Sequence, residues 1–151
     1  MSGKIQKEND NYIILRTSWV FSKDGKNFVN TILRLAKERD ELKVVNDQFG
    51  GPTSAACIAE VLLQLATEHK EHWGIYHFSG QPFMSRHKFA EAIVARAIEI
   101  GLVDHEVQLA SITSSELTVL ALRPKNSTLN NTKLTQIFCI EPSEWDKELF
   151  S

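Results

Sequence analysis

The sequence is poor in cysteine and close to neutral in charge. Its 151 residues include only two cysteines, Cys57 and Cys139, which are far apart and outside any paired motif. A disulfide framework is therefore not indicated, and a reducing, cytoplasmic setting is the simplest interpretation. The formal net charge of −2 lacks the basic excess that is typical of nucleic-acid-binding proteins. We therefore expect no nucleic acid as a partner.

Long apolar runs and metal-ligand patterns are missing as well. No apolar run approaches the roughly 18 residues of a membrane-spanning helix, so no membrane partner is expected. The first 11 residues are polar and lack the apolar core of a signal peptide, and we expect them to be a disordered or tag-like N-terminus. His69 and His72 lie three residues apart without a third ligand, so no metal site is predicted.

Three catalytic motifs are absent too: a glycine-rich phosphate loop, a Tyr-x-x-x-Lys pair and a Gly-x-Ser-x-Gly nucleophile motif. Yet residues 12–21 read Tyr-Ile-Ile-Leu-Arg-Thr-Ser-Trp-Val-Phe. A strand that is buried on both faces and ends at a binding crevice has this pattern. Because such a central strand comes so early, we expect the chain to be the second half of a larger fold.

Strand and helix patterns alternate through residues 12–151, which predicts an α/β fold. Ser85 suits the N-cap of a long helix, and Gly101 suits its C′ position. An earlier helix is expected to bury Ile58, Val61, Leu62 and Leu65. The predicted strands are 12–20, 42–46, 74–79 and 107–112, and the predicted helices are 27–39, 55–69, 85–100, 132–137 and 142–150.

Trp19 stands near the end of the first predicted strand, where ligands bind in open α/β sheets. An indole at such a place can cover a sugar ring and offer one N–H donor. The hydroxyls of Thr17 and Ser18 can bond a ligand amide or hydroxyl. The structural alternative is that Trp19 fills the core while Thr17 and Ser18 simply close the strand.

A second candidate segment is the loop at 47–53, Asp-Gln-Phe-Gly-Gly-Pro-Thr. Its two glycines let backbone N–H groups approach a ligand. Asp47 and Gln48 could bond sugar hydroxyls, and Thr53 opens a helix whose N-terminus favours anions. A plain turn into a capped helix is the alternative.

A third candidate segment is Arg-Pro-Lys-Asn-Ser at 123–127. Its proline stiffens the backbone, so that the Arg123 guanidinium could make a bidentate contact with phosphate. The alternative is that Arg123 is a solvated surface residue.

Taken in order, these motifs resemble the dTDP-4-dehydrorhamnose reductase family of extended short-chain dehydrogenases. The resemblance covers the chain from about Tyr12 and corresponds to roughly the C-terminal half of the family's domain. It is carried by Arg-Thr-Ser-Trp-Val-Phe at 16–21, Asn-Phe at 27–28, Leu-Arg-Leu-Ala at 33–36, Val-Asn-Asp-Gln-Phe-Gly-Gly-Pro-Thr at 45–53, Gly-Ile-Tyr-His-Phe-Ser-Gly at 74–80 and Arg-Pro-Lys-Asn-Ser at 123–127.

The resemblance implies a fold, an activity and a set of site residues. The fold would be the C-terminal portion of a Rossmann-type parallel sheet plus a small α/β substrate-binding lobe. The family reduces dTDP-4-dehydro-L-rhamnose with NADPH or NADH, and a tyrosine acts as the general acid. Because the Tyr-x-x-x-Lys pair is absent here, we expect the isolated chain to be inactive. By resemblance, the substrate-binding residues would be Trp19, Asp47, Gln48, Thr53, Arg123 and Asn126, and Thr17 and Ser18 would lie near the nicotinamide.

One departure and two alternatives stand beside this interpretation. The family often has Tyr-Pro-Thr-Pro shortly before its Arg-Pro, where this chain has Leu-Thr-Val-Leu at 117–120. One alternative is a non-catalytic binding module, like the regulatory β subunit of methionine adenosyltransferase. The other is a partial chain without activity. Under the reductase reading, a separate N-terminal half would be a partner. An unpaired first strand would also favour a homodimer or aggregation.

Overall fold

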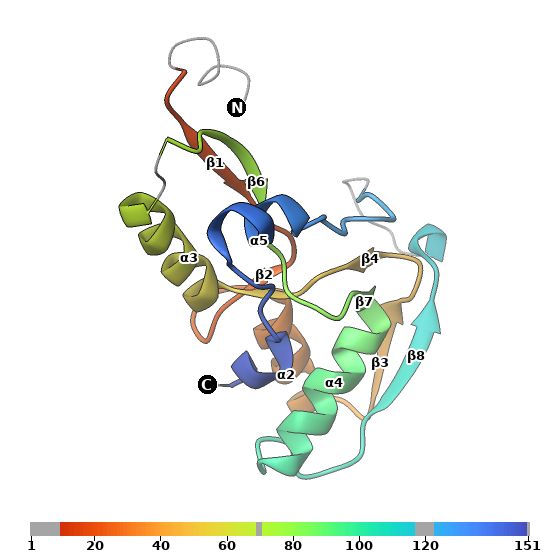
Figure 1. Cartoon of the computed structure of the whole chain (residues 1–151). Helices are drawn as coiled ribbons and strands as arrows, with labels where there is room; N and C mark the ends of the chain where they lie inside the picture. The colour runs from red at the N-terminus through yellow and green to blue at the C-terminus, as the bar shows by residue number, and fades with distance from the viewer. Residues whose placement is uncertain (1–9, 69–70, 117–122, 151) are drawn as a thin grey trace.

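Helices and strands alternate along the chain in the computed structural model, which describes residues 10–68, 71–116 and 123–150 (Figure 1). This confirms the predicted α/β fold. The strands are β1 (Ile13–Arg16), β2 (Val20–Phe21), β3 (Glu41–Val45), β4 (Phe49–Gly50), β5 (Thr53–Ser54), β6 (Gly74–His77), β7 (Met84–Ser85) and β8 (Gln108–Ile112). The helices are α2 (Phe28–Glu38), α3 (Ala55–Glu68), α4 (Arg86–Glu99) and α5 (Thr132–Phe138), with 3-10 turns η1 (Ser114–Glu116) and η2 (Trp145–Glu148).

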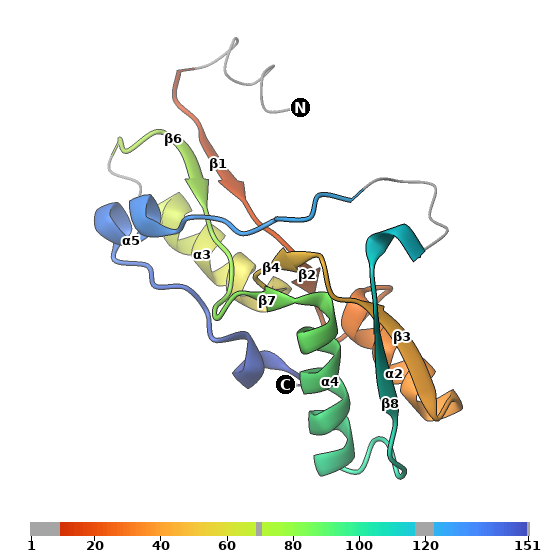
Figure 2. The same ribbon diagram turned by 90° about the vertical axis from the view of Figure 1, so that its right-hand side faces the viewer.

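The strands pair two by two within the described residues. β1 pairs with β6, β2 with β5 and β3 with β8, all in parallel, whereas β4 and β7 are antiparallel. Each parallel pair is joined by a connection that contains a helix, as parallel strands require. β1–β6 and β3–β8 lie at opposite ends of the molecule, with the short strands between them (Figures 1 and 2).

The first predicted strand is wrong in its length, because the chain breaks it into β1 and β2. The break falls at Trp19, whose φ of 48° lies in the left-handed region that few residues other than glycine adopt. Its carbonyl oxygen accepts a hydrogen bond from the Thr53 N–H at 3.2 Å. The turn redirects the chain, so that Val20 and Phe21 pair with β5 while Ile13–Arg16 pair with β6.

One hydrophobic core lies among α2, α4, β3 and β8. At its centre Phe89, which is fully buried, contacts the rings of Phe21, Phe28 and Trp145 at centroid distances of 6.0, 5.7 and 5.3 Å. The helix predicted at 27–39 is confirmed as α2, which buries Val29, Ile32 and Ala36 on one face. The Asn27 side chain caps α2 by accepting the Asn30 N–H at 3.0 Å.

A second core lies among β6, α3 and α5. It is built on Tyr76, Phe78 and Leu134, which are buried together with Val61 and Leu65 of α3. The expectation that Leu62 is buried is wrong: its side chain is 49% exposed, and that of Leu63 is 70% exposed. Ile58, the fourth residue expected on that face, is only partly buried against this core.

The predicted ends of α4 are confirmed. Ser85 accepts the Lys88 N–H at 3.2 Å, and Gly101 has a φ of +72° and donates its N–H to the Ile98 carbonyl oxygen at 3.0 Å. The prediction of a helix at 142–150 is wrong, because this stretch contains only the 3-10 turn η2. Within η2, Trp145 is buried and donates its indole N–H to the Pro82 carbonyl oxygen at 3.2 Å. None of the helices in the described segments has both the length and the apolar character of a membrane span.

Candidate functional site: a cationic cleft beside Trp19

A cleft of about 690 Å³ opens where the ends of several elements meet. We call it the Trp19 cleft. Three of the predicted site residues, Trp19, Gln48 and Arg123, line it although they come from three separate segments. Its described lining is Trp19, Val20, Lys26, Asn27, Phe28, Thr31, Val45, Gln48, Arg86, Arg123, Pro124 and Ser127. A second cleft of the same volume lies beside α5, but none of the predicted site residues lines it.

Gly50 allows the Trp19 ring to lie against the backbone of β4. A Cβ atom at this position would lie 2.4 Å from Trp19 Cε2 and 2.6 Å from Nε1, closer than real side chains pack. The indole also stacks with the ring of Phe89, at a centroid distance of 6.3 Å. Gly50 of the 47–53 loop therefore makes room for the Trp19 side chain. The sequence alone did not predict this contact.

Arg86, in the first turn of α4, covers an aromatic surface in the cleft. Its guanidinium carbon lies 3.9 Å from the centroid of the Trp19 ring and 4.7 Å from that of Phe28. Both distances are within the range of cation–π attraction. The indole face beneath Arg86 is therefore already occupied in this structure, which limits the part of Trp19 that a sugar ring can contact.

The cleft is positively charged although the chain as a whole carries a net charge of −2. Lys26, Arg86 and Arg123 line it, and its described lining contains no aspartate or glutamate. Burial and, to a smaller extent, the like charge of Arg123 together lower the pKa of Arg86 to about 10. Arg86 still carries its positive charge near neutral pH, and with the basic side chains of Lys26 and Arg123 on the same lining the cleft favours an anionic ligand.

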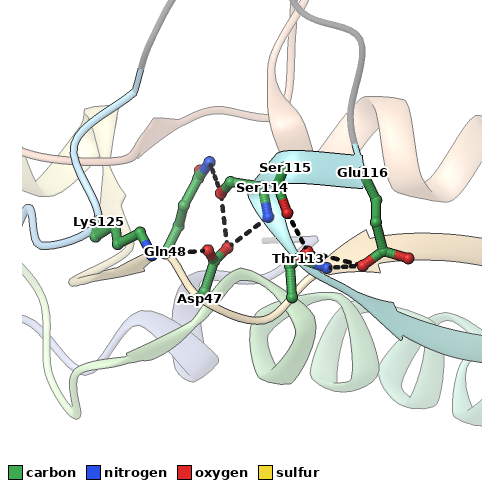
Figure 3. A network of polar contacts seen from close by, with 7 residues as sticks. All are labelled: Asp47, Gln48, Thr113, Ser114, Ser115, Glu116 and Lys125. Carbon is green, nitrogen blue, oxygen red and sulfur yellow. Dashed lines mark hydrogen bonds and ion pairs between the residues drawn. The ribbon is translucent and has the colours of Figure 1, made fainter.

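Asp47 is engaged by a hydrogen-bond network beside Gln48, which lines the cleft (Figure 3). Its Oδ1 accepts the backbone N–H and the hydroxyl of Ser114 at 2.9 and 2.6 Å, and its Oδ2 lies 3.4 Å from Lys125 Nζ. These hydrogen bonds, with the charge of Lys125, hold the pKa of Asp47 below its usual value against a smaller opposing effect of burial. Gln48 is buried and donates from Nε2 to the Ser114 hydroxyl at 3.0 Å.

Thr53 and Asn126 are placed away from the described lining of the cleft. Thr53 is fully buried, and its hydroxyl lies 2.8 Å from the Ser18 carbonyl oxygen and 3.0 Å from that of Gly51, while it accepts the Gly80 N–H at 3.2 Å. Asn126 Oδ1 accepts the N–H and hydroxyl of Thr128 at 2.9 and 2.8 Å. Their roles in substrate binding stay predictions, since both side chains already have partners within the protein.

Thr17 and Ser18 follow the carboxyl end of β1, as expected for residues near a ligand crevice. Thr17 is exposed, whereas Ser18 is buried and its hydroxyl has no hydrogen-bond partner among the described residues. A buried hydroxyl without a partner is uncommon and indicates a place for an additional polar group. The predicted departure at 117–120 lies outside the described residues.

Sequence reasoning missed Lys26, Asn27 and Arg86 as cleft residues. Lys26 and Asn27 precede α2 within a turn, and Arg86 directly follows the N-cap of α4, so local signals describe only their helix ends. Their convergence on Trp19 depends on how α2 and α4 pack around Phe89, which no local pattern encodes. No group of three or more metal-ligating side chains gathers in the part of the chain that the structure describes.

Comparison with known proteins identifies the family. Residues 2–151 match the model of the RmlD substrate binding domain. The chain belongs to this family. Its curated relatives include the dTDP-4-dehydrorhamnose reductases of Aggregatibacter actinomycetemcomitans, 47% identical over 141 residues, and Burkholderia thailandensis, 41% identical over 150 residues. The matches cover 91% and 93% of this chain but 48% and 50% of those relatives, so this RmlD-family chain spans about half their length.

Solved structures give the same result for the fold. The dTDP-4-dehydrorhamnose reductase of Bacillus anthracis in complex with NADP superposes with a TM-score of 0.86 at 32% identity, over 98% of this chain and 50% of that one. The Clostridium acetobutylicum reductase gives a TM-score of 0.82 at 34% identity, with the same coverage. These likenesses confirm the predicted family and the Rossmann-type fold class of this RmlD-family chain. They also agree with the expectation that it corresponds to one half of the family's domain.

Proposed function

We propose that this chain is the substrate-binding part of a dTDP-4-dehydrorhamnose reductase, which reduces dTDP-4-dehydro-L-rhamnose to dTDP-L-rhamnose. The observation that carries the proposal is the Trp19 cleft, where Trp19, Gln48 and Arg123 meet although they lie far apart in sequence. Its combination of aromatic surface and cationic groups suits a nucleotide sugar, in which a negatively charged diphosphate links a nucleoside to a sugar ring. The names of the curated relatives support the same substrate.

In this proposal the cleft binds and orients the substrate. Trp19 offers its indole edge and N–H to the sugar, and Arg123 supplies a fork of N–H donors to phosphate oxygens. In this proposal Asp47 holds neighbouring segments of the protein in place and does not itself contact the ligand. Its bonds to Ser114 and Lys125 fix both η1 and the segment that carries Arg123. The free, unbonded cysteines agree with the reducing cytoplasm as the place where the chain works.

NADPH or NADH would supply the hydride when bound. The residues present fit only one edge of such a cofactor: the buried Ser18 hydroxyl lacks a partner among the described residues, and exposed Thr17 stands beside it. No glycine-rich motif for a dinucleotide occurs in the sequence. The main cofactor site and the Tyr-x-x-x-Lys acid would therefore come from the part of the relatives that this chain does not match.

Reconstitution tests the proposal. The purified chain is mixed with the segment of the A. actinomycetemcomitans reductase that precedes its matching region, and NADPH oxidation is followed with dTDP-4-dehydro-L-rhamnose. We expect no turnover by the chain alone or by that segment alone, and turnover by the mixture. Turnover by the pure chain would overturn the expected inactivity. A stable complex without turnover, or co-purification with a large unrelated enzyme, would favour a regulatory binding module instead.

A further inference from the structure

Arg86 is a desolvated cation without a counter-charge among the residues that the structure describes. The side chain is half-buried in the Trp19 cleft and lies over the rings of Trp19 and Phe28. Within the described residues, its guanidinium makes no ion pair with a carboxylate and donates no hydrogen bond. Buried charges are ordinarily paired, because removing an ion from water is costly unless a partner compensates for the loss. The two aromatic rings supply only part of that compensation.

Other arginines in the chain show the usual arrangement. Arg96, further along α4, lies 2.7 Å from Glu99, and Arg34 on α2 lies 3.1 Å from Glu38. Both are on the surface, where water already stabilises their charge. Arg86 therefore combines the greater need for an anion with the lack of one in the described structure.

Arg123 adds a second positive charge to the same cleft. Arg86, Arg123 and Lys26 line the same cleft, so their like charges repel one another. After burial, the charge of Arg123 is the second cause of the lowered pKa of Arg86. Like charges placed together in a partly buried cleft destabilise the protein unless an anion binds between them. An anion with several oxygens would engage both planar guanidinium groups, each of which can bond two oxygens at once.

We propose that Arg86 and Arg123 form a paired subsite for a diphosphate group, with Arg86 held in position by Trp19 and Phe28. The identification of the diphosphate as part of a nucleotide sugar rests on the proposed function. The subsite itself rests on the contacts and charges of this chain.

Calorimetric titration with inorganic phosphate, pyrophosphate and dTDP tests the subsite in the isolated chain. We expect affinity to rise from phosphate to pyrophosphate, and to fall as salt is added. R86M should weaken pyrophosphate binding about 10- to 100-fold, the equivalent of one charge-assisted contact pair. R86K keeps the charge but loses the fork, so its affinity should be intermediate. The matched control R96M removes an exposed arginine of the same helix and should bind as the unmodified chain does.

The Trp19 indole N–H resonance gives a second, structural readout. Pyrophosphate should shift this resonance in the unmodified chain and in R96M but not in R86M, whose fold is checked by circular dichroism. The subsite is refuted by unchanged pyrophosphate affinity in a folded R86M chain, or by no pyrophosphate binding to the unmodified chain. If R86M does not fold, R86K decides by the same criterion. Arg86-dependent pyrophosphate binding without reconstituted turnover would refute the proposed function and leave the subsite standing.

Discussion

Asp47 and Ser114 are joined by two hydrogen bonds to one carboxylate oxygen, from the Ser114 N–H at 2.9 Å and from its hydroxyl at 2.6 Å. The other oxygen of the same carboxylate lies 3.4 Å from Lys125 Nζ. Ser114 belongs to η1, and Lys125 belongs to the segment that carries Arg123 into the Trp19 cleft. One side chain thereby connects η1 with the segment around Lys125, and both are distant from it in sequence (Figure 3).

The D47N substitution should weaken this connection in a pH-dependent way. The pKa of Asp47 in the folded chain is below its ordinary value of about 3.9, so the carboxylate stabilises the fold above that pH. That stabilisation is lost as the pH falls through the lowered pKa. The difference in Tm between the unmodified chain and D47N should therefore be full at neutral pH and shrink below about pH 4. A difference that does not change with pH would contradict this account.

D47N should also weaken pyrophosphate binding, because it loosens the segment that presents Arg123. The control is E38Q, which breaks a surface ion pair with Arg34 on α2 and leaves the cleft intact. We expect E38Q to bind pyrophosphate with unchanged affinity in the same calorimetric titration. Both substitutions remove one negative charge, so an equal change of affinity in the two variants would show that Asp47 acts only through overall charge.

G50A should displace Trp19. The new Cβ would lie 2.4 Å from Trp19 Cε2, so the indole or the backbone must move, at a cost of about 1–3 kcal/mol. The Trp19 indole N–H resonance should shift strongly, and pyrophosphate binding should weaken because Arg86 loses its ring support. G101A is the matched control: its strained left-handed backbone costs about 1–2 kcal/mol, but nothing lies within 4 Å of the added Cβ. It should leave the Trp19 resonance unchanged.

Elements with a local cause could be predicted from the sequence. The N-cap at Ser85 and the C′ residue Gly101 depend on neighbours within a few residues, and both are confirmed, as is the helix predicted at 27–39. The break at Trp19 could not be predicted, because it depends on pairing with β5 across 33 residues of chain. The exposure of Leu62 was missed for a similar reason: helical spacing alone does not show which flank of an apolar stripe faces the core.

The candidate site follows the same division. Arg123 and Trp19 stand in recognisable motifs, and the structure brings both to one cleft. Arg86 has no motif of its own, and only its contacts with Trp19 and Phe28 disclose it. Thr53 is the opposite case, because it stands in a recognisable motif but does not line the cleft. Its side chain is fully buried and forms hydrogen bonds with backbone groups.

Thr53 variants should separate a structural role from a ligand role. T53V removes the acceptor of the Gly80 N–H and the donor to the Ser18 carbonyl, leaving buried groups unpaired at a cost of about 1–3 kcal/mol in the free energy of unfolding. T53S keeps the hydroxyl and should lose less. Urea denaturation measures both effects. If Thr53 instead bonds the substrate, folded T53V should lose dTDP affinity to an extent that its stability does not account for.

Two leucine-to-alanine changes should differ sharply. Leu134 is fully buried in the second core, so L134A should lower the free energy of unfolding by about 2–5 kcal/mol. Leu63 is 70% exposed on α3, so L63A should change it by no more than about 0.5 kcal/mol. Urea denaturation of both variants checks the positions of the two side chains. Similar losses would mean that the exposed face of α3 packs against something in solution.

The outer edge of β1 should make the isolated chain self-associate. Among the described residues β1 pairs only with β6, so one edge of this apolar strand offers unpaired backbone groups to another chain. Light scattering should show a mass that rises with protein concentration. Addition of the preceding segment of the A. actinomycetemcomitans reductase should suppress this rise, because both partners would compete for one edge. A clean monomer at all concentrations would refute the prediction, and a dimer that persists in the mixture would place the contact on another face.

The doubly substituted L62A/L63A chain tests the exposed face of α3 directly, and it should still self-associate if the β1 edge is responsible.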